Sequence, residues 1–242
     1  MRYVVSMLLP LFLISCSESK ILLKSLSTYQ APLDYLHDSK ICDCDKSATI
    51  ALAQFDGQVF DSATSVSKIN HKVLPLVIYN FEKLNLAVDL GQNSLEQNYS
   101  DFFKKSFTVE SQRTGCYSVA DKPTDSNYSL EITYDTCSIK SKYQRNSTVI
   151  FLLLAYSVSV QEIGFPAESN IALNVKLKKD SNLIFEKRYS VERTQPFLNT
   201  NQRDVNRLRS DFVTNMAESL SFSTKACIET IVADINRVID QQ

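Results

Sequence analysis

The chain has 242 residues, with 26 lysines and arginines, 27 aspartates and glutamates, and a formal net charge of −1 at pH 7. A nearly neutral chain without a block of five or six like charges has no electrostatic field for nucleic acid, so we expect no nucleic-acid partner. Four glycines, six prolines and no tryptophan also exclude a low-complexity chain that is rich in flexible linkers.

The first fifteen residues have the pattern of a cleavable targeting segment. One basic residue, Arg2, precedes an apolar run from Val4 to Ile14 that only Ser6 and Pro10 interrupt. At about eleven residues this run has the length of a signal-peptide core, and it is too short to cross a bilayer, which takes about 17–25 residues. We therefore expect residues 1–15 to be a signal peptide.

Leu13, Ile14 and Ser15 precede Cys16, and this order resembles the lipobox of bacterial lipoproteins. The resemblance implies cleavage before Cys16, with a diacylglycerol on its sulfur and an acyl chain such as palmitate on its amine; two or more chains give a durable membrane anchor. In such lipoproteins an aspartate after the cysteine commonly signals retention at the inner membrane. Ser17 stands there instead, so the resemblance implies the outer membrane, with the protein facing the periplasm. The alternative is an ordinary secretory signal with a chance cysteine.

Removing the signal leaves 227 residues (242 minus 15), enough for one sizeable hydrophobic core. We expect a lipidated cysteine and tether at residues 16–47 and a single domain at residues 48–242. Runs with strand-like and helical periodicity both occur in this domain, which predicts an α+β fold. It would consist of a mixed, mainly antiparallel sheet, one mid-chain amphipathic helix, and a C-terminal helix or helix pair packed on a face.

The expected elements follow from apolar periodicity and turn residues. Strands are predicted at residues 48–55, 72–81, 84–90, 116–119 and 128–134, with a short helical turn at residues 66–71 and a hairpin turn at Glu82-Lys83. A helix with Ser94 as N-cap and Gly115 as its C′ residue is predicted from its aromatic stripe. The stripe residues are Leu95, Tyr99, Phe102, Phe103 and Phe107.

The second half of the chain begins with its most apolar mature stretch, residues 149–160. We expect a buried central strand there, the alternative being an element that faces a membrane or a partner. A hairpin is predicted at residues 171–177 and 183–191. From residue 201 two apolar stripes at helical spacing predict two helices or one kinked helix, with a break around residues 221–224.

Five cysteines remain after Cys16, which leaves at least one thiol without an intramolecular partner in an oxidising compartment. They are Cys42, Cys44, Cys116, Cys137 and Cys227. We expect a disulfide bond between Cys116 and Cys137, because each lies in or beside an expected strand and a turn-rich stretch separates them. This bridge would contribute about 3 kcal/mol on the chain-entropy account. A bridge between Cys42 and Cys44 would be strained at this spacing.

Cys42 and Cys44 lie close to His37, and thiolates with an imidazole suit Cu(I) or Zn(II). A single C-x-C with one histidine lacks the second ligand pair of a structural zinc site, so we expect no metal and no other cofactor. A thiol-based metal-binding or redox role for these three residues is the alternative function.

Motifs of dinucleotide binding, phosphate binding, serine hydrolysis and zinc proteolysis are missing from the sequence. We therefore expect a membrane-anchored envelope lipoprotein that is not an enzyme. It would bind a protein partner, or another component, as an accessory of an envelope assembly or transport system. The order of expected elements is loosely similar to that of small α+β accessory lipoproteins of envelope transporters, an analogy that no motif supports.

Overall fold

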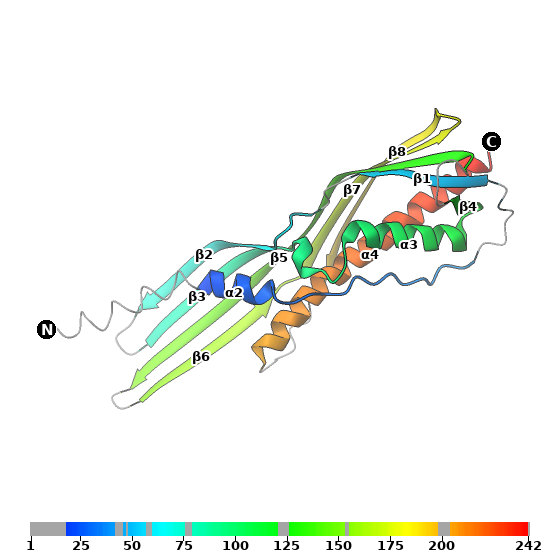
Figure 1. Cartoon of the computed structure of the whole chain (residues 1–242). Helices are drawn as coiled ribbons and strands as arrows, with labels where there is room; N and C mark the ends of the chain where they lie inside the picture. The colour runs from blue at the N-terminus through cyan, green and yellow to red at the C-terminus, as the bar shows by residue number, and fades with distance from the viewer. Residues whose placement is uncertain are drawn as a thin grey trace.

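The computed structural model describes residues 18–41, 46, 48–56, 60–75, 79–120, 126–152, 155–197 and 204–241, and shows an elongated α+β fold (Figure 1). The expected signal peptide, Cys16, Cys42 and Cys44 lie outside these residues. The elements in chain order are α2 (Glu18–Leu26), β1 (Ala48–Asp56), β2 (Ser65–Pro75), β3 (Tyr79–Asp89), the 3-10 helix η1 (Gln92–Ser94), α3 (Tyr99–Thr114), β4 (Tyr117–Ala120), β5 (Tyr128–Leu152), β6 (Ala155–Gly164), β7 (Ala167–Lys179), β8 (Asn182–Gln195) and α4 (Val205–Ile239).

The described strands form one eight-stranded sheet around β5. This strand has 25 residues, which is about 80 Å at about 3.3 Å per residue. Its first half lies between β1, in parallel, and β7, and its second half lies between β3 and β6, both antiparallel. β4 extends β1 in parallel, whereas β2 and β8 add antiparallel edges. The predicted fold class, a mixed and mainly antiparallel sheet with a C-terminal helix, is confirmed.

α3 and α4 lie on one face of this sheet, mainly along the first half of β5, whereas α2 contacts β2 beside its second half (Figure 1). α3 contributes a buried aromatic stripe that contains Tyr99, Phe103 and Phe107. Its N-cap is Asn98, whose side chain accepts the backbone N–H groups of the first turn, so the predicted cap at Ser94 is wrong. Ser94 instead ends the 3-10 helix η1. Gly115 follows the helix, where a Cβ would lie 2.4 Å from the Ser111 carbonyl oxygen, so no side chain fits there.

α4 is one continuous helix of 35 residues, about 52 Å long, and the predicted break at residues 221–224 is wrong. The hydroxyls of Ser221 and Thr224 donate to carbonyls four residues earlier, at 2.9 and 2.8 Å. The hydroxyl of Ser223 pairs with that of Ser169 on β7, at 2.7 Å. Since these polar groups have partners within the fold, they are buried without interrupting the helix.

The first hairpin also differs from the prediction. Residues 66–71 belong to β2 rather than to a helical turn, and β2 and β3 pair continuously past Glu82 and Lys83, which are not the turn. A register shift between Lys68 and Asn70 interrupts the two-residue alternation, which explains why the pattern was not strand-like there.

Residues 149–160 are not a buried central strand. Of these, the described residues 149–152 on β5 and 155–160 on β6 belong to an antiparallel hairpin that extends beyond the helices (Figure 1). Tyr156 is 73% exposed and Val158 is 54% exposed. The sequence alternative, an apolar element that faces outward, therefore describes the observed position better.

Candidate functional site

The segment from Ala31 to Ile41, which we call the strap, is extended and lies across α3 and α4 (Figure 1). Ala31, Leu33 and Tyr35 are buried while the residues between them are exposed, the two-residue alternation of an extended chain on an apolar surface. The Ala31 backbone donates to the Ser94 carbonyl at 2.9 Å and accepts from the Glu96 amide at 3.1 Å.

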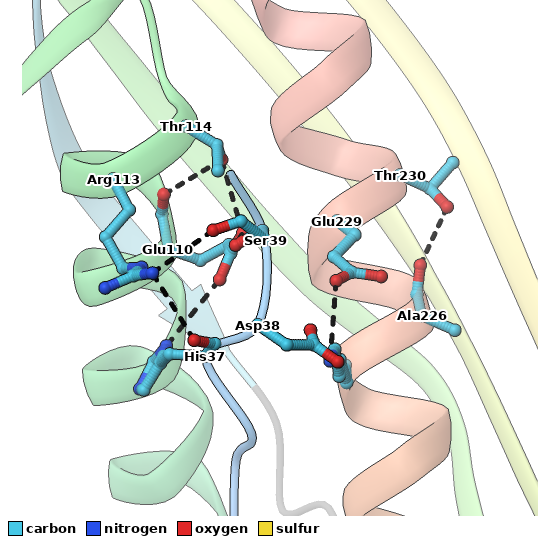
Figure 2. Close-up of polar contacts among 10 residues, drawn as sticks. His37, Asp38, Ser39, Glu110, Arg113, Thr114, Ala226, Glu229 and Thr230 are labelled. Carbon is cyan, nitrogen blue, oxygen red and sulfur yellow. Dashed lines mark hydrogen bonds and ion pairs between the residues drawn. The ribbon is translucent and has the colours of Figure 1, made fainter. Parts of the chain in front are cut away.

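A buried carboxylate on α3 holds the far end of the strap (Figure 2). The side chain of Glu110 is 1% exposed; its Oε1 accepts the Ser39 hydroxyl at 2.5 Å, and its Oε2 lies 3.6 Å from Nδ1 of His37. Arg113, one turn later, donates to the backbone carbonyls of His37 and Ser39 at 3.3 and 3.1 Å. We call Glu110, Arg113 and these two strap residues the latch.

The strap contacts α4 through a lysine and a serine. Lys225 pairs with Asp38 and also lies 3.8 Å from Glu229, and Ser221 Oγ accepts the Asp34 amide at 3.2 Å. The hydrogen bond from Lys225 lowers the pKa of Asp38. Burial, together with the carboxylates of Glu110 and Asp38, raises the pKa of Glu229 despite the nearby lysine. The strap therefore joins the two long helices through charged contacts as well as apolar ones.

The latch has the residue types of a hydrolase triad but not its geometry. A serine nucleophile needs a base that takes its proton, and a carboxylate that orients that base. Ser39 donates to the carboxylate itself, and His37 approaches the other oxygen of the same carboxylate. In this arrangement the imidazole does not accept the serine proton, so the contacts position the strap.

The alternative metal site is only partly described. His37 belongs to the latch and packs on the ring of Tyr35, with 4.7 Å between the ring centroids, whereas Cys42 and Cys44 lie outside the described residues. Within the described ranges, no group of three or more histidine, cysteine, aspartate or glutamate side chains is placed to hold a metal ion.

The structure contradicts the expected disulfide bond between Cys116 and Cys137. Cys116 precedes Tyr117, the first residue of β4, which pairs with Ala48 on β1. Tyr128, the first residue of β5, pairs with Ile50, only two residues further along β1, so Cys116 lies near the start of β5. Cys137 is nine residues further along β5, about 30 Å away at about 3.3 Å per residue, whereas bridged Cα atoms lie about 4.4–6.8 Å apart. Burial raises the pKa of both Cys137 and Cys227, that of Cys227 to about 12.

The two hairpins that extend past the helices lie side by side in the sheet. Lys72, Lys83, Asn146 and Gln161 form one row across β2, β3, β5 and β6. We call the described residues beyond this row (73–75, 79–82, 147–152 and 155–160) the hairpin end. The sequence has no charged residue between Lys72 and Glu82 or between Arg145 and Glu162. Half of the exposed large apolar side chains of the described chain lie here: Val73, Leu74, Ile150, Tyr156, Val158 and Val160.

A buried ion pair ties the base of the hairpin end to two helices. Glu162 on β6 is 1% exposed and accepts two hydrogen bonds from Arg209 on α4, at 2.8 and 2.5 Å, and one from the Tyr143 hydroxyl at 2.5 Å. Arg209 also donates to Ser25 on α2 at 3.1 Å. Burial alone would lower the pKa of Arg209, but the hydrogen bonds and charge of Glu162 raise it.

Comparisons with known proteins give little further information. No family model and no curated protein match the sequence. Among solved structures, the chain is similar to the crystal structure of protein XCC0632 from Xanthomonas campestris, of the DUF330 family, with 14% identity and a TM-score of 0.41 over 88% of this chain and 96% of that chain. Of the helices in the described part of the chain, none is long and apolar enough to span a membrane.

Neither Glu110 nor Glu162 was predicted, although each breaks a pattern. Glu110 is three residues after Phe107 on the buried stripe of α3, where an apolar residue is expected. Glu162 continues the outward alternation of Tyr156, Val158 and Val160. A carboxylate at an apolar position of a periodic segment is the signal that would have indicated a buried polar contact.

Proposed function

We propose that this chain is a lipid-anchored protein of the cell envelope that binds a partner at the membrane and is not an enzyme. The supporting observation is that the residues after Cys16 are packed on the domain. α2 begins two residues after Cys16 and buries Leu22 and Leu26, and the strap follows it. An anchor at Cys16 would therefore be joined to the domain without a long free linker, and would fix the height and orientation of the domain above the bilayer.

In this proposal α3 and α4 form the surface on which the strap packs. The protein is anchored in the outer membrane, and its domain lies in the periplasm. Ser17 after Cys16 is the residue that supports this location. A domain held in one orientation suits an accessory component of an assembly or transport system, which must meet its partner at a set distance from the membrane. No observation on the described residues favours the alternative metal or redox role of Cys42, Cys44 and His37.

The test compares Cys16→Ser with Cys42→Ser, a control that removes another thiol close to the N-terminus. In a bacterium with two membranes, we expect the wild type and Cys42→Ser to incorporate radioactive palmitate and to sediment with the outer membrane. Cys16→Ser should lose both properties. The proposal is wrong if Cys16→Ser keeps the label and stays membrane-bound, because the anchor then lies elsewhere.

The partner is sought by cross-linking intact cells and purifying the lipidated chain in detergent. We expect a protein that cross-links to the wild type and not to Cys16→Ser, since only the anchored domain is held at the right height. Equal cross-linking of both chains would show that anchoring does not position the binding surface.

A further inference from the structure

The hairpin end has exposed apolar side chains on both faces of the sheet, with Ser157 and Ser159 among them on one face and Glu82 at its base. Tyr156, Val158 and Val160 alternate along β6, so they share one face with Glu162 and Tyr143, the face that the helices cover further along. Leu74 pairs with Phe81, which in turn pairs with Thr148 on β5, and paired residues share a face. Val158 pairs with Val149, the next residue of β5, whose side chain points to the other face, so Leu74 and Val158 lie on opposite faces. Leu74 is 60% exposed, and Ile150 on the same face is also exposed.

This distribution decides between two kinds of partner. A protein that docks on a sheet covers one face, and the other face then stays polar against water. A sheet end that enters a lipid phase is surrounded by it, so apolar side chains are expected on both faces. The hairpin end, with exposed apolar side chains on both faces, is closer to the second pattern.

The hairpin end also lies on the side of the expected anchor. α2 contacts β2, and its first turn, two residues after Cys16, points toward the hairpin end (Figure 1). Ile21 on this turn is an exposed apolar side chain as well. Acyl chains on Cys16 would therefore enter the bilayer beside the two hairpins.

From this geometry we propose that the hairpin end lies in the interface of the bilayer that holds the lipid anchor, with its two apolar faces in the boundary between headgroups and acyl chains. The inference rests on the proposed function for the identity of the membrane. Lys72 and Lys83, paired across β2 and β3 at the start of the hairpin end, meet the phosphate groups of anionic lipids.

The backbone limits the depth. At the hairpin end β2 and β6 are the outer strands, so one side of each leaves backbone N–H and C=O groups that need water or headgroups as partners. The exposed apolar side chains run from the level of Ser147, which Val73 and Val160 share, to the level of Phe151, which pairs with Tyr156; this is four positions of β5, about 13 Å. Apolar faces of interfacial elements enter a membrane by about 5–10 Å, so the outer part of the hairpin end enters it while the Ser147 level stays among the headgroups.

The chain contains no tryptophan, so one introduced tryptophan reports on one position. Tyr156→Trp and Leu74→Trp place it on the two faces of the hairpin end. Leu183→Trp is the matched control, since Leu183 is 51% exposed and also lies in a hairpin. Leu183 pairs with Lys178, which pairs with Ser129 on β5, whereas Tyr156 pairs with Phe151. The two levels are therefore 22 positions of β5 apart, which is roughly 70 Å at about 3.3 Å per residue.

The lipidated variants are reconstituted in vesicles of phosphatidylethanolamine and phosphatidylglycerol, with and without bromine on the acyl chains. We expect the emission of Trp variants at 156 and 74 to shift to shorter wavelength on vesicles and to be quenched by the brominated lipid. The emission of the variant at 183 should not change. The inference is wrong if neither hairpin position is quenched on vesicle-bound protein, or if only one of the two positions is quenched. The hairpin end would then be explained by a protein that contacts one face.

A second set of samples separates this inference from the anchor itself. The same tryptophan variants, carrying Cys16→Ser and a hexahistidine tag in front of Ser17, are held on vesicles that contain a nickel-chelating lipid. Quenching at positions 156 and 74 in this arrangement supports the inference even if palmitate labelling shows that Cys16 is not lipidated. Absence of quenching here refutes it while leaving lipidation at Cys16 intact.

Discussion

The ion pair of Glu162 and Arg209 is expected to be the most sensitive polar contact of the described chain, because it is buried and joins β6 to α4. Arg209→Ala leaves a carboxylate that is 1% exposed without its two strongest donors. Removing one partner of a buried ion pair costs about 3–5 kcal/mol. Arg145, whose Nε lies 3.8 Å from Glu162, and the Tyr143 hydroxyl remain, so we expect the lower limit, about 3 kcal/mol.

For a chain of this size, about 3 kcal/mol corresponds to a fall in Tm of about 6–12 °C. Thermal and urea unfolding of the detergent-purified chain measure it. Arg207→Ala is the matched control, since Arg207 is 74% exposed and 4.0 Å from Asp211, and it should change the free energy of unfolding by less than about 0.5 kcal/mol. Arg209→Met with Glu162→Leu should recover most of the loss, because no unpaired charge stays buried. A loss below about 1 kcal/mol for Arg209→Ala would refute this account of the hairpin base.

Three further predictions concern other contacts. The pKa of Asp234 is lowered because hydrogen bonds from Lys187 and Tyr189 outweigh burial, so its contribution to stability is present at neutral pH and lost as the pH falls below about 4. The difference in unfolding free energy between wild type and Asp234→Asn should therefore shrink from pH 7 to pH 3 in urea titrations. An unchanged difference would contradict this. Arg113→Ala should speed amide exchange around residues 37–40 about tenfold without changing exchange in the sheet, as read by mass spectrometry, whereas equal exchange would mean that the latch does not hold the strap. Iodoacetamide should modify Cys227, which is buried, and Cys137, which is partly buried, only after denaturant is added, because burial raises the pKa of both thiols. Rapid native labelling, or a peptide that links Cys116 to Cys137, would show that the described positions are wrong.

Much of the sheet could be predicted because its strands alternate in the ordinary way. β7 and β8 show regular alternation and a polar turn, where Asp180 and Ser181 adopt positive φ angles of 49° and 70°. The first part of β2 could not be predicted, since a bulge breaks its period. The continuous α4 was missed because serine and threonine hydroxyls ordinarily favour caps and turns, and only the fold shows that carbonyls and Ser169 satisfy them.

The position of residues 149–160 could not be predicted from their composition alone. A long apolar run is typical of a central strand, and only the pairing of β5 with β6 shows that the run folds back on itself beyond the helices. The disulfide expectation failed for a similar reason. Two expected strands separated by a turn-rich stretch suggested that the cysteines face each other, whereas β4 and β5 lie on opposite sides of β1 in parallel and β5 places Cys137 far along the sheet.

The central claim is that Cys16 anchors a domain whose strap and α2 fix its orientation, and the intact mass of the protein purified from membranes tests it most directly. We expect a chain that lacks residues 1–15 and carries a diacylglycerol and an acyl group on its first residue, Cys16. A chain that begins at Met1, or one that begins near residue 16 with an unmodified Cys16, would contradict the claim.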